Sequence, residues 1–592
     1  MCGLCGEIRF DGQRVEGEPL QRMMASMISR GPDQHGLHLN GPVGFGHRRL
    51  KILDLSDRAG QPMIDPESGH VLVFNGCIYN FEALRQELEA KGHRFLTSGD
   101  TEVILKAYRE WGWQAVSRFL GMFAFALWDA DTGEVVLARD RLGIKPLYLA
   151  RSAGRLRFAS TLPALLAAGG VDTRLDKQAL HHYLTLHSVV PPPHTLLAGV
   201  SKLPPATVRI VQPDGAIRDH LYWSLRIGGE VEEREPSFEA WQERVLAALR
   251  LAVKRRLVAD VPVGVLLSGG LDSSLIVALL AEAGQGRAGL ETFSVGFEAV
   301  GAKEGDEFRY SDRVAAHFGT RHHRLPIATS EMLQALPRAI GAMSEPMTSH
   351  DNVGFFLLSR EVSRHVKVVQ SGQGADEVFA GYFWHPPMRE SRTPLQDYIR
   401  LYFDRSHEEI AKVLQPDWVE RDYTLERVEN HFAGLTGCGP LDKVLHFDTA
   451  VILVDDPVKR LDNMTMAWGL EARVPFLDHE LVELAGRIPA RFKAGERGKW
   501  LLKEAARTLL PAEVIDRPKG YFPVPALEDL QGEVLLRVRE VLTSERARQR
   551  ELFRPSHVER LLAEPLAHHT PLKGSKLWQL ALLEWWLQDK GV

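Results

Sequence analysis

The chain has 592 residues, of which 44% are hydrophobic, 25% charged and 8% aromatic. This length predicts more than one domain, and this apolar content excludes disorder over most of the chain. The formal net charge of −5 gives no sign of a nucleic-acid-binding surface. The four cysteines exclude a disulfide scaffold and are typical of a reducing compartment.

The N-terminus lacks the basic start and apolar run of a secretory signal. The most apolar long stretch, residues 261–284, contains Asp272 and two adjacent glycines. It therefore predicts a buried strand, a loop and a helix rather than a membrane span. We expect a soluble, multidomain, cytoplasmic protein whose partners include neither membranes nor nucleic acid.

The first part of the chain predicts a β-rich domain. Residues 71–74 predict a short strand that ends at the turn dipeptide Asn75-Gly76, and a helix is expected over 80–91. Two hairpins are expected further along, one from residue 122 to 138 and one over 148–160. The stretch 190–205 holds five prolines and predicts an extended surface connection.

A charged stretch at 228–236 predicts a linker, so we expect a first domain over 2–215, a linker over 216–236 and a second domain over 237–592. Strands and helices then alternate, which predicts a doubly wound parallel sheet. The last part of the chain predicts mainly helices. The expected alternating elements are helix 238–257, strand 263–267, helix 274–283, strand 291–295, helix 306–318 and strand 366–370.

Cys2 directly follows the initiator methionine, which is generally removed when the next residue is small. Cys2 would then carry a thiol and a free α-amine, and the amine can act as general base for its own thiol. Chance is one alternative. A C-x-x-C pair with Cys5 is another, but it has neither a second pair for zinc nor a strand-to-helix turn for redox chemistry.

Four further motifs follow Cys2 in a fixed order: Arg30-Gly31-Pro32-Asp33, His47-Arg48-Arg49-Leu50, Phe74-Asn75-Gly76-Cys77-Ile78-Tyr79-Asn80 and Ser98-Gly99-Asp100-Thr101-Glu102. Together they resemble the glutaminase domain of class II glutamine amidotransferases, which are N-terminal-nucleophile hydrolases. The resemblance implies an αββα sandwich in which Cys2 attacks the amide of glutamine.

The other motif residues suit the remaining contacts of glutamine. A guanidinium can hold the α-carboxylate with two parallel hydrogen bonds; Arg49 is the expected residue and Arg48 the weaker candidate. Asp100 can pair with the α-ammonium. The Asn75 side chain and the Gly76 backbone N–H can donate to the oxyanion, unless the dipeptide is a simple hairpin turn. Neighbouring Cys77 is expected to serve packing.

A second constellation, Ser268-Gly269-Gly270-Leu271-Asp272-Ser273-Ser274, lies between a predicted strand and a predicted helix. Glycine N–H groups, serine hydroxyls and a helix N-terminus favour a phosphate site, and the Gly-Lys-Ser/Thr of a Walker A loop is absent. Asp272 would repel phosphate, so we expect Mg²⁺ between Asp272 and a pyrophosphate. A glycine-rich turn alone would not require the whole string.

This string resembles the loop of ATP pyrophosphatases, which split ATP between its α and β phosphates and adenylate a substrate. A second loop, from Ser371 to Glu377, follows another predicted strand, and both loops are expected at the carboxyl edge of the sheet. In it, Asp376 is a candidate second Mg²⁺ ligand. The expected ATP- and pyrophosphate-binding residues are Leu266, Ser268, Gly269, Gly270, Asp272, Ser273, Val295, Ser371 and Gly372.

Motifs over 460–464, 469–478, 498–504 and 517–520 resemble the helical C-terminal region of asparagine synthetases. Lys499 is expected to stabilise charge on the α-phosphate, and its alternative is a solvated helix-surface lysine. Arg473 and Asp478 are equally well explained as structural salt-bridge residues. The pairs His181-His182 and His322-His323 lack metal-site spacing and are expected at the surface or in packing.

Both domains in this order resemble the asparagine synthetase family. The implied reaction hydrolyses glutamine at Cys2 through a thioester, passes ammonia internally, and converts an acyl-adenylate into an amide with release of AMP and pyrophosphate. A closed passage is expected because ammonia released to water at neutral pH becomes ammonium and loses its nucleophilicity. The implied partners are glutamine, ATP and a carboxylate acceptor, with a homodimer as a family-level expectation.

One position departs from this family. Gln373 stands where asparagine synthetases carry Glu, and Gln can neither act as a general base nor carry charge. At this position and over residues 186–193 and 343–351, the chain resembles bacterial N-acetylglutaminylglutamine amidotransferases, which amidate a dipeptide to make an osmoprotectant. We expect a blocked dipeptide as the acceptor, with aspartate as the alternative.

Two other classes of protein are alternatives. Glutamine–fructose-6-phosphate amidotransferase shares the first domain's motifs but would lack the loop at residues 268–273. A non-catalytic glutamine sensor would not need the retained Cys2, Asn75, Asp100 and Asp272.

Overall fold

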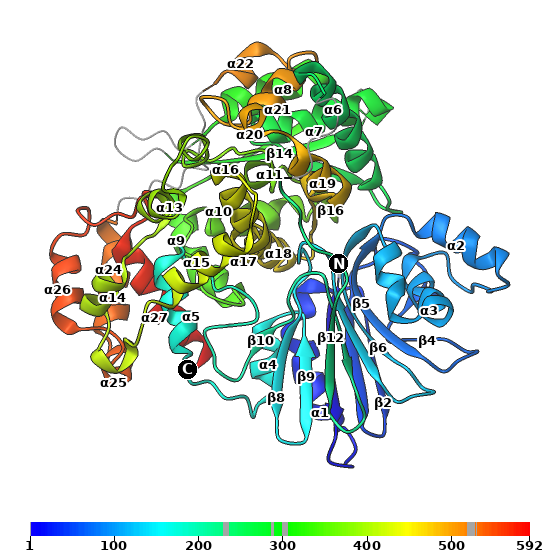
Figure 1. Cartoon of the computed structure of the whole chain (residues 1–592). Helices are drawn as coiled ribbons and strands as arrows, with labels where there is room; N and C mark the ends of the chain where they lie inside the picture. Colours follow the sequence, from blue (N-terminus) through cyan, green and yellow to red (C-terminus); the bar gives the residue numbers. More distant parts are fainter. Residues whose placement is uncertain (1, 229–235, 286–288, 299–305, 518–526, 528–529) are drawn as a thin grey trace.

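The computed structural model describes residues 2–228, 236–285, 289–298, 306–517, 527 and 530–592. An N-terminal part made of antiparallel sheets is followed by a C-terminal part with a parallel sheet and many helices (Figure 1). The two parts pack directly against each other, so residues far apart in the sequence share one interface.

Two six-stranded antiparallel sheets form the N-terminal part, in the orders β10-β8-β9-β1-β3-β2 and β12-β11-β7-β6-β5-β4. Alternate apolar residues such as Leu4, Phe45 and Val73 fill the space between the sheets, as the period of two in a strand requires. The strands are β1 Gly3–Arg9, β2 Gln34–Asn40, β3 Val43–Arg49, β4 Met63–Ile64, β5 Val71–Ile78, β6 Gly121–Trp128, β7 Val135–Arg139, β8 Tyr148–Ser152, β9 Arg155–Ala159, β10 Ser201–Lys202, β11 Thr207–Val211 and β12 Ile217–Leu221.

Helices cover the outer face of each sheet. Helices α1 (Gly17–Ser26) and α4 (Leu162–Ala168) pack on the first sheet. Helices α2 (Phe81–Ala90) and α3 (Asp100–Trp111) share an apolar cluster with the second sheet. The resulting four layers are the αββα sandwich expected from the sequence.

Five parallel strands form the C-terminal sheet in the order β15-β14-β13-β16-β17. The order reverses between β13 and β16, so the crevice at their carboxyl ends is the place where such sheets bind ligands. This is the doubly wound arrangement expected from the sequence. The strands are β13 Val263–Leu266, β14 Glu291–Phe297, β15 Arg321–Ile327, β16 Val368–Gln370 and β17 Glu471–Arg473.

Helices surround this sheet and continue into the C-terminal region (Figure 1). Among the described helices, none combines the length and the apolar character that crossing a membrane requires. The longer helices are α5 Lys177–Thr185, α6 Phe238–Arg255, α7 Leu271–Leu280, α8 Phe308–Phe318, α9 Thr329–Ala342, α10 Asp351–Val362, α13 Pro394–Tyr402, α15 Tyr423–Gly434, α16 Pro440–Phe447, α18 Pro457–Met466, α19 His479–Arg487, α24 Gly532–Thr543, α26 Pro555–Ala563 and α27 Lys576–Lys590.

The dipeptide Asn75-Gly76 is not a turn, contrary to the expectation from the sequence. Strand β5 continues through it to Ile78, and Gly76 lies opposite Phe123 of β6. A Cβ atom on Gly76 would lie 2.1 Å from the carbonyl oxygen of Met122, so glycine is needed for strand contact rather than for a reversal.

Three other expectations are corrected. The proline-rich stretch 190–205 is not a surface connection, because Val190, Leu196 and Leu197 in it are fully buried. Strand β15 was missed because its polar residues, including the partly buried His322-His323 pair, show no apolar alternation. Strand β17 was missed because it has three residues inside a region expected to be helical.

The first residues of the expected linker, 216–236, belong to the N-terminal part rather than to a linker. Strand β12 pairs with β11 and extends the second sheet to Leu221, beyond residue 215. Residues 229–235 lie outside the described residues.

Buried ion pairs join the two parts of the chain. Arg30 of the N-terminal part pairs with Asp462 of α18 at 2.8 Å, and Lys145 lies 3.7 Å from the same carboxylate. Lys202 contacts Glu345 and Asp455 at 2.7 Å each. All six side chains are almost completely buried, so each charge depends on its partner across the interface.

We expect Asp462→Ala to lower the free energy of unfolding by about 3–5 kcal/mol, because Arg30 and Lys145 would remain buried without their partner. Chemical denaturation of the full chain measures this. Glu420→Gln is the matched control, because its pair with Lys177 also joins the two parts but is 40% and 48% exposed. The control should change stability by less than about 1 kcal/mol.

The same ion pair predicts a pH dependence. Burial raises the pKa of Asp462, but Arg30 and Lys145 lower it by more, so the pKa lies below its ordinary value of 3.8. The stabilisation is therefore present above about pH 4 and is lost as the pH falls through the folded-state pKa. Equal losses for the wild type and Asp462→Ala between pH 5 and pH 3 would contradict this account.

Candidate active sites

The first candidate site surrounds Cys2, at the start of β1. The backbone nitrogen of Cys2 donates a hydrogen bond to Oδ1 of Asn75 at 3.0 Å. Asn75 is fully buried, and its Nδ2 has no hydrogen-bond partner among the described residues. A buried donor without a partner costs about 1–3 kcal/mol, so this amide is poised to receive an oxygen atom from a ligand.

The thiol of Cys2 is itself almost completely buried. Burial raises the pKa of the thiol, while the backbone N–H of Leu50 and the Arg49 guanidinium oppose the increase. The net effect keeps the thiol protonated at neutral pH, so a base must remove its proton before it can act as a nucleophile.

Arg49 and Arg48 end β3 and face opposite sides of the sheet. Arg48 donates to the carbonyl of Met24 in α1 at 3.1 Å, away from the cysteine. Arg49 is held by protein oxygens rather than by a described carboxylate, which leaves its charge available to a ligand. These oxygens are Oε1 of Gln34 and the backbone carbonyls of Leu53, Asp54 and Ser56.

Asp100 is the first residue of α3 and lies beside the end of β5. Its Oδ2 accepts a hydrogen bond from the backbone N–H of Ile78 at 2.9 Å. Burial raises the pKa of Asp100 to about 6, partly offset by that N–H. A cationic ligand group would therefore favour the ionised carboxylate.

The C-terminal part contributes residues beside this site that were not predicted to lie there. Arg473 pairs with Glu471 at 2.5 Å and donates to the carbonyl of Arg256. The guanidinium of Arg256 lies 4.9 Å from the ring centroid of Tyr79, and that of Arg473 lies 5.7 Å from it. Asp478 accepts from Arg256 at 2.9 Å. Arg473 and Asp478 are thus structural salt-bridge residues of the interface.

The second candidate site lies at the carboxyl ends of β13 and β16. Leu266 ends β13, Val295 lies on neighbouring β14, and the loop that follows β13 leads directly into α7 at Leu271. Inside the loop, Oγ of Ser268 and Oγ of Ser273 are 3.1 Å apart. Gly269 has a φ of +73°, and a Cβ atom there would lie 2.5 Å from the backbone nitrogen of Ser311.

Lys499 joins the two loops. Its Nζ lies 2.6 Å from Oδ2 of Asp272 and 2.8 Å from Oδ1 of Asp376. Lys499 is only 7% exposed, so it is not a solvated surface lysine, and the two carboxylates raise its pKa despite burial. Gly372, next to Ser371, lets the second loop lie close to the first, because a Cβ atom on Gly372 would lie 2.9 Å from Cβ of Asp272.

The donor set suits a divalent cation. Two carboxylates from different loops converge on one positive charge, and carboxylate oxygens are the ligands that Mg²⁺ prefers. The adjacent loop N–H groups and α7 N-terminus suit the anion that such a cation would accompany. Asp272 and Asp376 therefore fit the Mg²⁺ ligand set expected from the sequence.

Gly381 and Glu377 belong to this site but were not predicted. A Cβ atom on Gly381 would lie 2.0 Å from Oδ1 of Asp376 and 2.3 Å from Cε of Lys499. Burial raises the pKa of Glu377 to about 7, and the Tyr382 hydroxyl donates to its Oε1 at 2.6 Å. A lone glycine in sequence carries no signal of such a contact.

Arg517 lies beside the first loop. Its guanidinium lies 4.5 Å from the ring centroid of Tyr310 and 3.3 Å from Glu307. Its Nη1 is buried with no partner among the described residues, and its Nη2 lies near Gly270. The neighbouring motif residues Lys519 and Gly520 lie outside the described part of the chain.

Helix α18 lies between the two sites. Asp462 on this helix holds Arg30, whose Nε donates to the carbonyl of Cys2 at 3.3 Å. Arg460, two residues earlier, pairs with Asp351 at 3.0 Å. Burial lowers the pKa of Arg460, but Asp351 and, more weakly, Glu377 of the second loop raise it, and the net pKa lies above its ordinary value. This short helix thus contacts the surroundings of Cys2 through Arg30 and lies close enough to Glu377 for its charge to act on Arg460.

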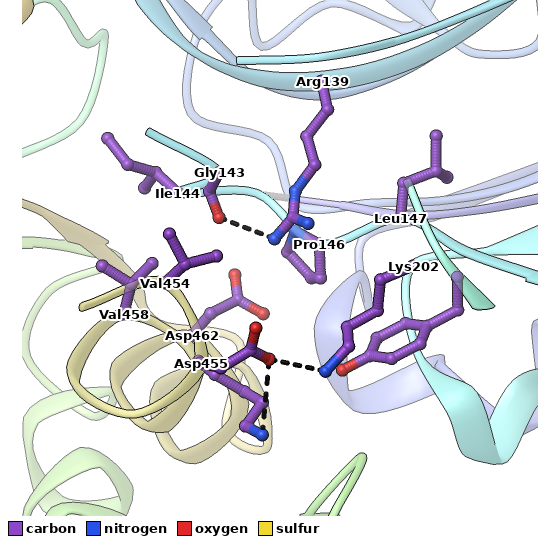
Figure 2. Close-up of a pocket in the computed structure, with 12 residues that line it drawn as sticks. Arg139, Gly143, Ile144, Pro146, Leu147, Lys202, Val454, Asp455, Val458 and Asp462 are labelled. Atoms are coloured by element: carbon purple, nitrogen blue, oxygen red, sulfur yellow. Dashed lines mark hydrogen bonds and ion pairs between the residues drawn. The ribbon is translucent and has the colours of Figure 1, made fainter. Parts of the chain in front are cut away.

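A small cavity of about 10 Å³ lies on the same interface (Figure 2). This is close to the space that one water-sized molecule requires. Figure 2 shows the ion pair of Lys202 with Asp455 along its wall. Lys459 lies 3.6 Å from the same carboxylate. The N-terminal lining residues are Arg139, Gly143, Ile144, Pro146, Leu147, Tyr148 and Lys202, and the C-terminal ones are Val454, Asp455, Val458, Lys459 and Asp462.

Comparison with known proteins covers both parts of the chain. The family model described as asparagine synthase matches residues 244–588, and the model described as a glutamine amidotransferase domain matches residues 1–223. Glutamine-hydrolysing asparagine synthetase 1 of Bacillus subtilis strain 168 is 33% identical over 584 residues, which cover 92% of this chain and 90% of the relative.

Two further relatives agree. A putative glutamine-hydrolysing asparagine synthetase of Mycobacterium bovis is 35% identical over 597 residues, covering 90% of this chain and 89% of its own. Asparagine synthetase B of Escherichia coli strain K12 is 30% identical over 537 residues, covering 88% and 82%. The chain therefore belongs to the asparagine synthase family of carbon–nitrogen ligases and carries a glutamine amidotransferase domain at its N-terminus.

Proposed function

We propose that the chain releases ammonia from glutamine at Cys2 and uses it at the second site to amidate an adenylated carboxylate. The observation that carries this proposal is Asn75, whose Oδ1 binds the Cys2 nitrogen while its buried Nδ2 lacks a partner among the described residues. That arrangement orients the prospective base and supplies a free donor where an oxyanion would form.

In the first half-reaction, removal of Met1 frees the α-amine of Cys2, which takes the proton of the buried thiol. The thiolate attacks the amide carbon of glutamine while Asn75 Nδ2 and the N–H of Gly76 bind the oxyanion. The C–N bond breaks, ammonia leaves with the transferred proton, and water hydrolyses the thioester to glutamate. Arg49 holds the α-carboxylate of glutamine, and Asp100 holds its α-ammonium.

In the second half-reaction, the loop at 268–273 and the loop at Ser371-Gly372 bind the phosphates of ATP at the sheet's carboxyl edge. Bound Mg²⁺, held by Asp272 and Asp376, would neutralise pyrophosphate charge. Lys499 stabilises charge on the α-phosphate as the acceptor carboxylate attacks it; the bond between the α- and β-phosphates breaks, pyrophosphate leaves and the acyl-adenylate remains. Ammonia then crosses the interface beside α18 and attacks the acyl-adenylate, which gives the amide and AMP.

For the acceptor, we propose N-acetylglutaminylglutamine, a blocked dipeptide whose amide serves as an osmoprotectant. Gln373 supports this choice, because an acceptor site without the usual Glu differs in charge from one that binds aspartate. The asparagine synthase reaction on aspartate fits the family equally well. We also propose that the chain acts in the cytoplasm as a homodimer.

We expect Cys2→Ala to lower glutaminase activity at least about 1,000-fold, because the nucleophile is lost. Synthesis with added ammonia should stay within about threefold of wild type, since the second site is untouched. Cys438→Ala, at a half-buried cysteine far along the chain, is the control and should keep both activities. Full glutaminase activity in Cys2→Ala would refute the nucleophile assignment and favour a glutamine sensor.

We expect Gly381→Ala to lower ATP–pyrophosphate exchange at least about tenfold, because the new Cβ displaces Asp376 and Lys499. Glutaminase activity should remain, since Cys2 is untouched. Gly434→Ala is the matched control, because its Cβ would meet no described heavy atom within 4 Å apart from its own helix. Wild-type exchange in Gly381→Ala would show that the Asp376–Lys499 contact is not needed for adenylation.

The acceptor is tested by ATP–pyrophosphate exchange with a panel of carboxylates. We expect exchange with N-acetylglutaminylglutamine to exceed exchange with aspartate by at least about tenfold, a difference of about 1.4 kcal/mol in transition-state stabilisation. Strong exchange with aspartate and none with the dipeptide would assign the chain to asparagine synthesis instead.

A further inference from the structure

Asp260 belongs to the C-terminal part but binds the segment that holds Arg49. Its Oδ2 accepts a hydrogen bond from the backbone N–H of Asp54 at 2.7 Å. Its own backbone N–H donates to the carbonyl of Ile52 at 2.9 Å. Side chain and backbone of one residue thus clamp the segment 52–54 from across the interface.

The clamped segment supplies two of the four oxygen atoms that accept hydrogen bonds from the Arg49 guanidinium. We call these four oxygens the Arg49 cage. The backbone carbonyls of Leu53 and Asp54 both accept from Nη2 of Arg49. Asp54 has a φ of +50°, a left-handed conformation that a non-glycine residue keeps only when its surroundings hold it. The hydrogen bond to Asp260 is part of what holds it there.

Asp54 also reaches the segment that leads to Asp100. Its Oδ2 accepts a hydrogen bond from the backbone N–H of Ser98 at 2.8 Å, and a Cβ atom on Gly99 would lie 3.3 Å from the Cβ atom of Asp54. The residue held by Asp260 therefore contacts the surroundings of both groups proposed to bind the two ends of glutamine.

The other face of the segment packs on the parallel sheet. Leu50 and Ile52 form an apolar cluster with Val368 of β16, against which Val261 and Val263 also pack. Val263 begins β13 and lies opposite Val368 in the sheet. The strands whose carboxyl ends carry the two phosphate loops therefore support the Arg49 segment at their amino ends.

We infer that Asp260 is a positioning residue for glutamine, through which the C-terminal part sets the geometry of the Arg49 cage. This inference rests on the proposed role of Arg49 in binding glutamine. Asp260 acts through the backbone of Asp54 and touches neither substrate nor reacting atoms. Its own side chain lies at the exposed rim of the interface, so its removal leaves no buried charge.

The test compares glutaminase kinetics of the full-length wild type, Asp260→Ala and Asp260→Asn. We expect Asp260→Ala to raise the KM for glutamine about 5- to 20-fold, as expected for loss of a charge-assisted hydrogen bond, with kcat within about threefold of wild type. Asp260→Asn keeps an oxygen acceptor for the Asp54 N–H and should restore KM to within about threefold. Ammonia-dependent synthesis should be unchanged in both variants.

Two further variants separate the possible outcomes. Glu420→Gln removes another ion pair between the two parts, away from this segment, and should leave the KM for glutamine unchanged. Arg49→Ala should raise this KM at least about 100-fold. If it does not, the proposed glutamine site is wrong; if it does but Asp260→Ala matches Glu420→Gln, the inference about Asp260 alone is overturned. An equal defect in Asp260→Asn and Asp260→Ala also overturns it.

Discussion

The buried pairing of Arg30 with Asp462 is the interaction on which the arrangement of both sites depends. Two charges removed from water are tolerable only while each keeps its partner, so the two parts of the chain pack favourably in one relative arrangement. In that arrangement Arg30 also donates to the carbonyl of Cys2, and Asp462 fixes α18. The position of the nucleophile and the position of the helix between the sites thus follow from the same ion pair.

The two sites solve opposite electrostatic problems. Around Cys2, the groups proposed to act are a neutral thiol, a neutral amide, the Arg49 guanidinium held by carbonyl oxygens and the Asp100 carboxylate, and all of them are buried. The second site concentrates two carboxylates and balances them with the buried Lys499. The net negative charge that remains suits a divalent cation bound together with phosphate groups.

Sequence reasoning went furthest where chemistry requires contiguous residues. Local strings of residues suffice to propose roles for Cys2, the Asn75-Gly76 dipeptide and the loop at 268–274, and the alternating pattern predicted the parallel sheet. The sequence did not predict why glycine is needed where the reason is a contact with a distant residue. Gly76 is required by Met122 across the sheet, and Gly381 by Asp376 and Lys499. The three-residue strand β17 is likewise defined by its neighbour β16, not by its own pattern.

The same distinction explains why the Asp260 contact is visible only in three dimensions. A lone aspartate before a predicted strand reads as a loop residue, and nothing in its neighbours links it to Asp54. The fold makes the link because the amino ends of β13 and β16 face the glutaminase part while their carboxyl ends face the phosphate loops.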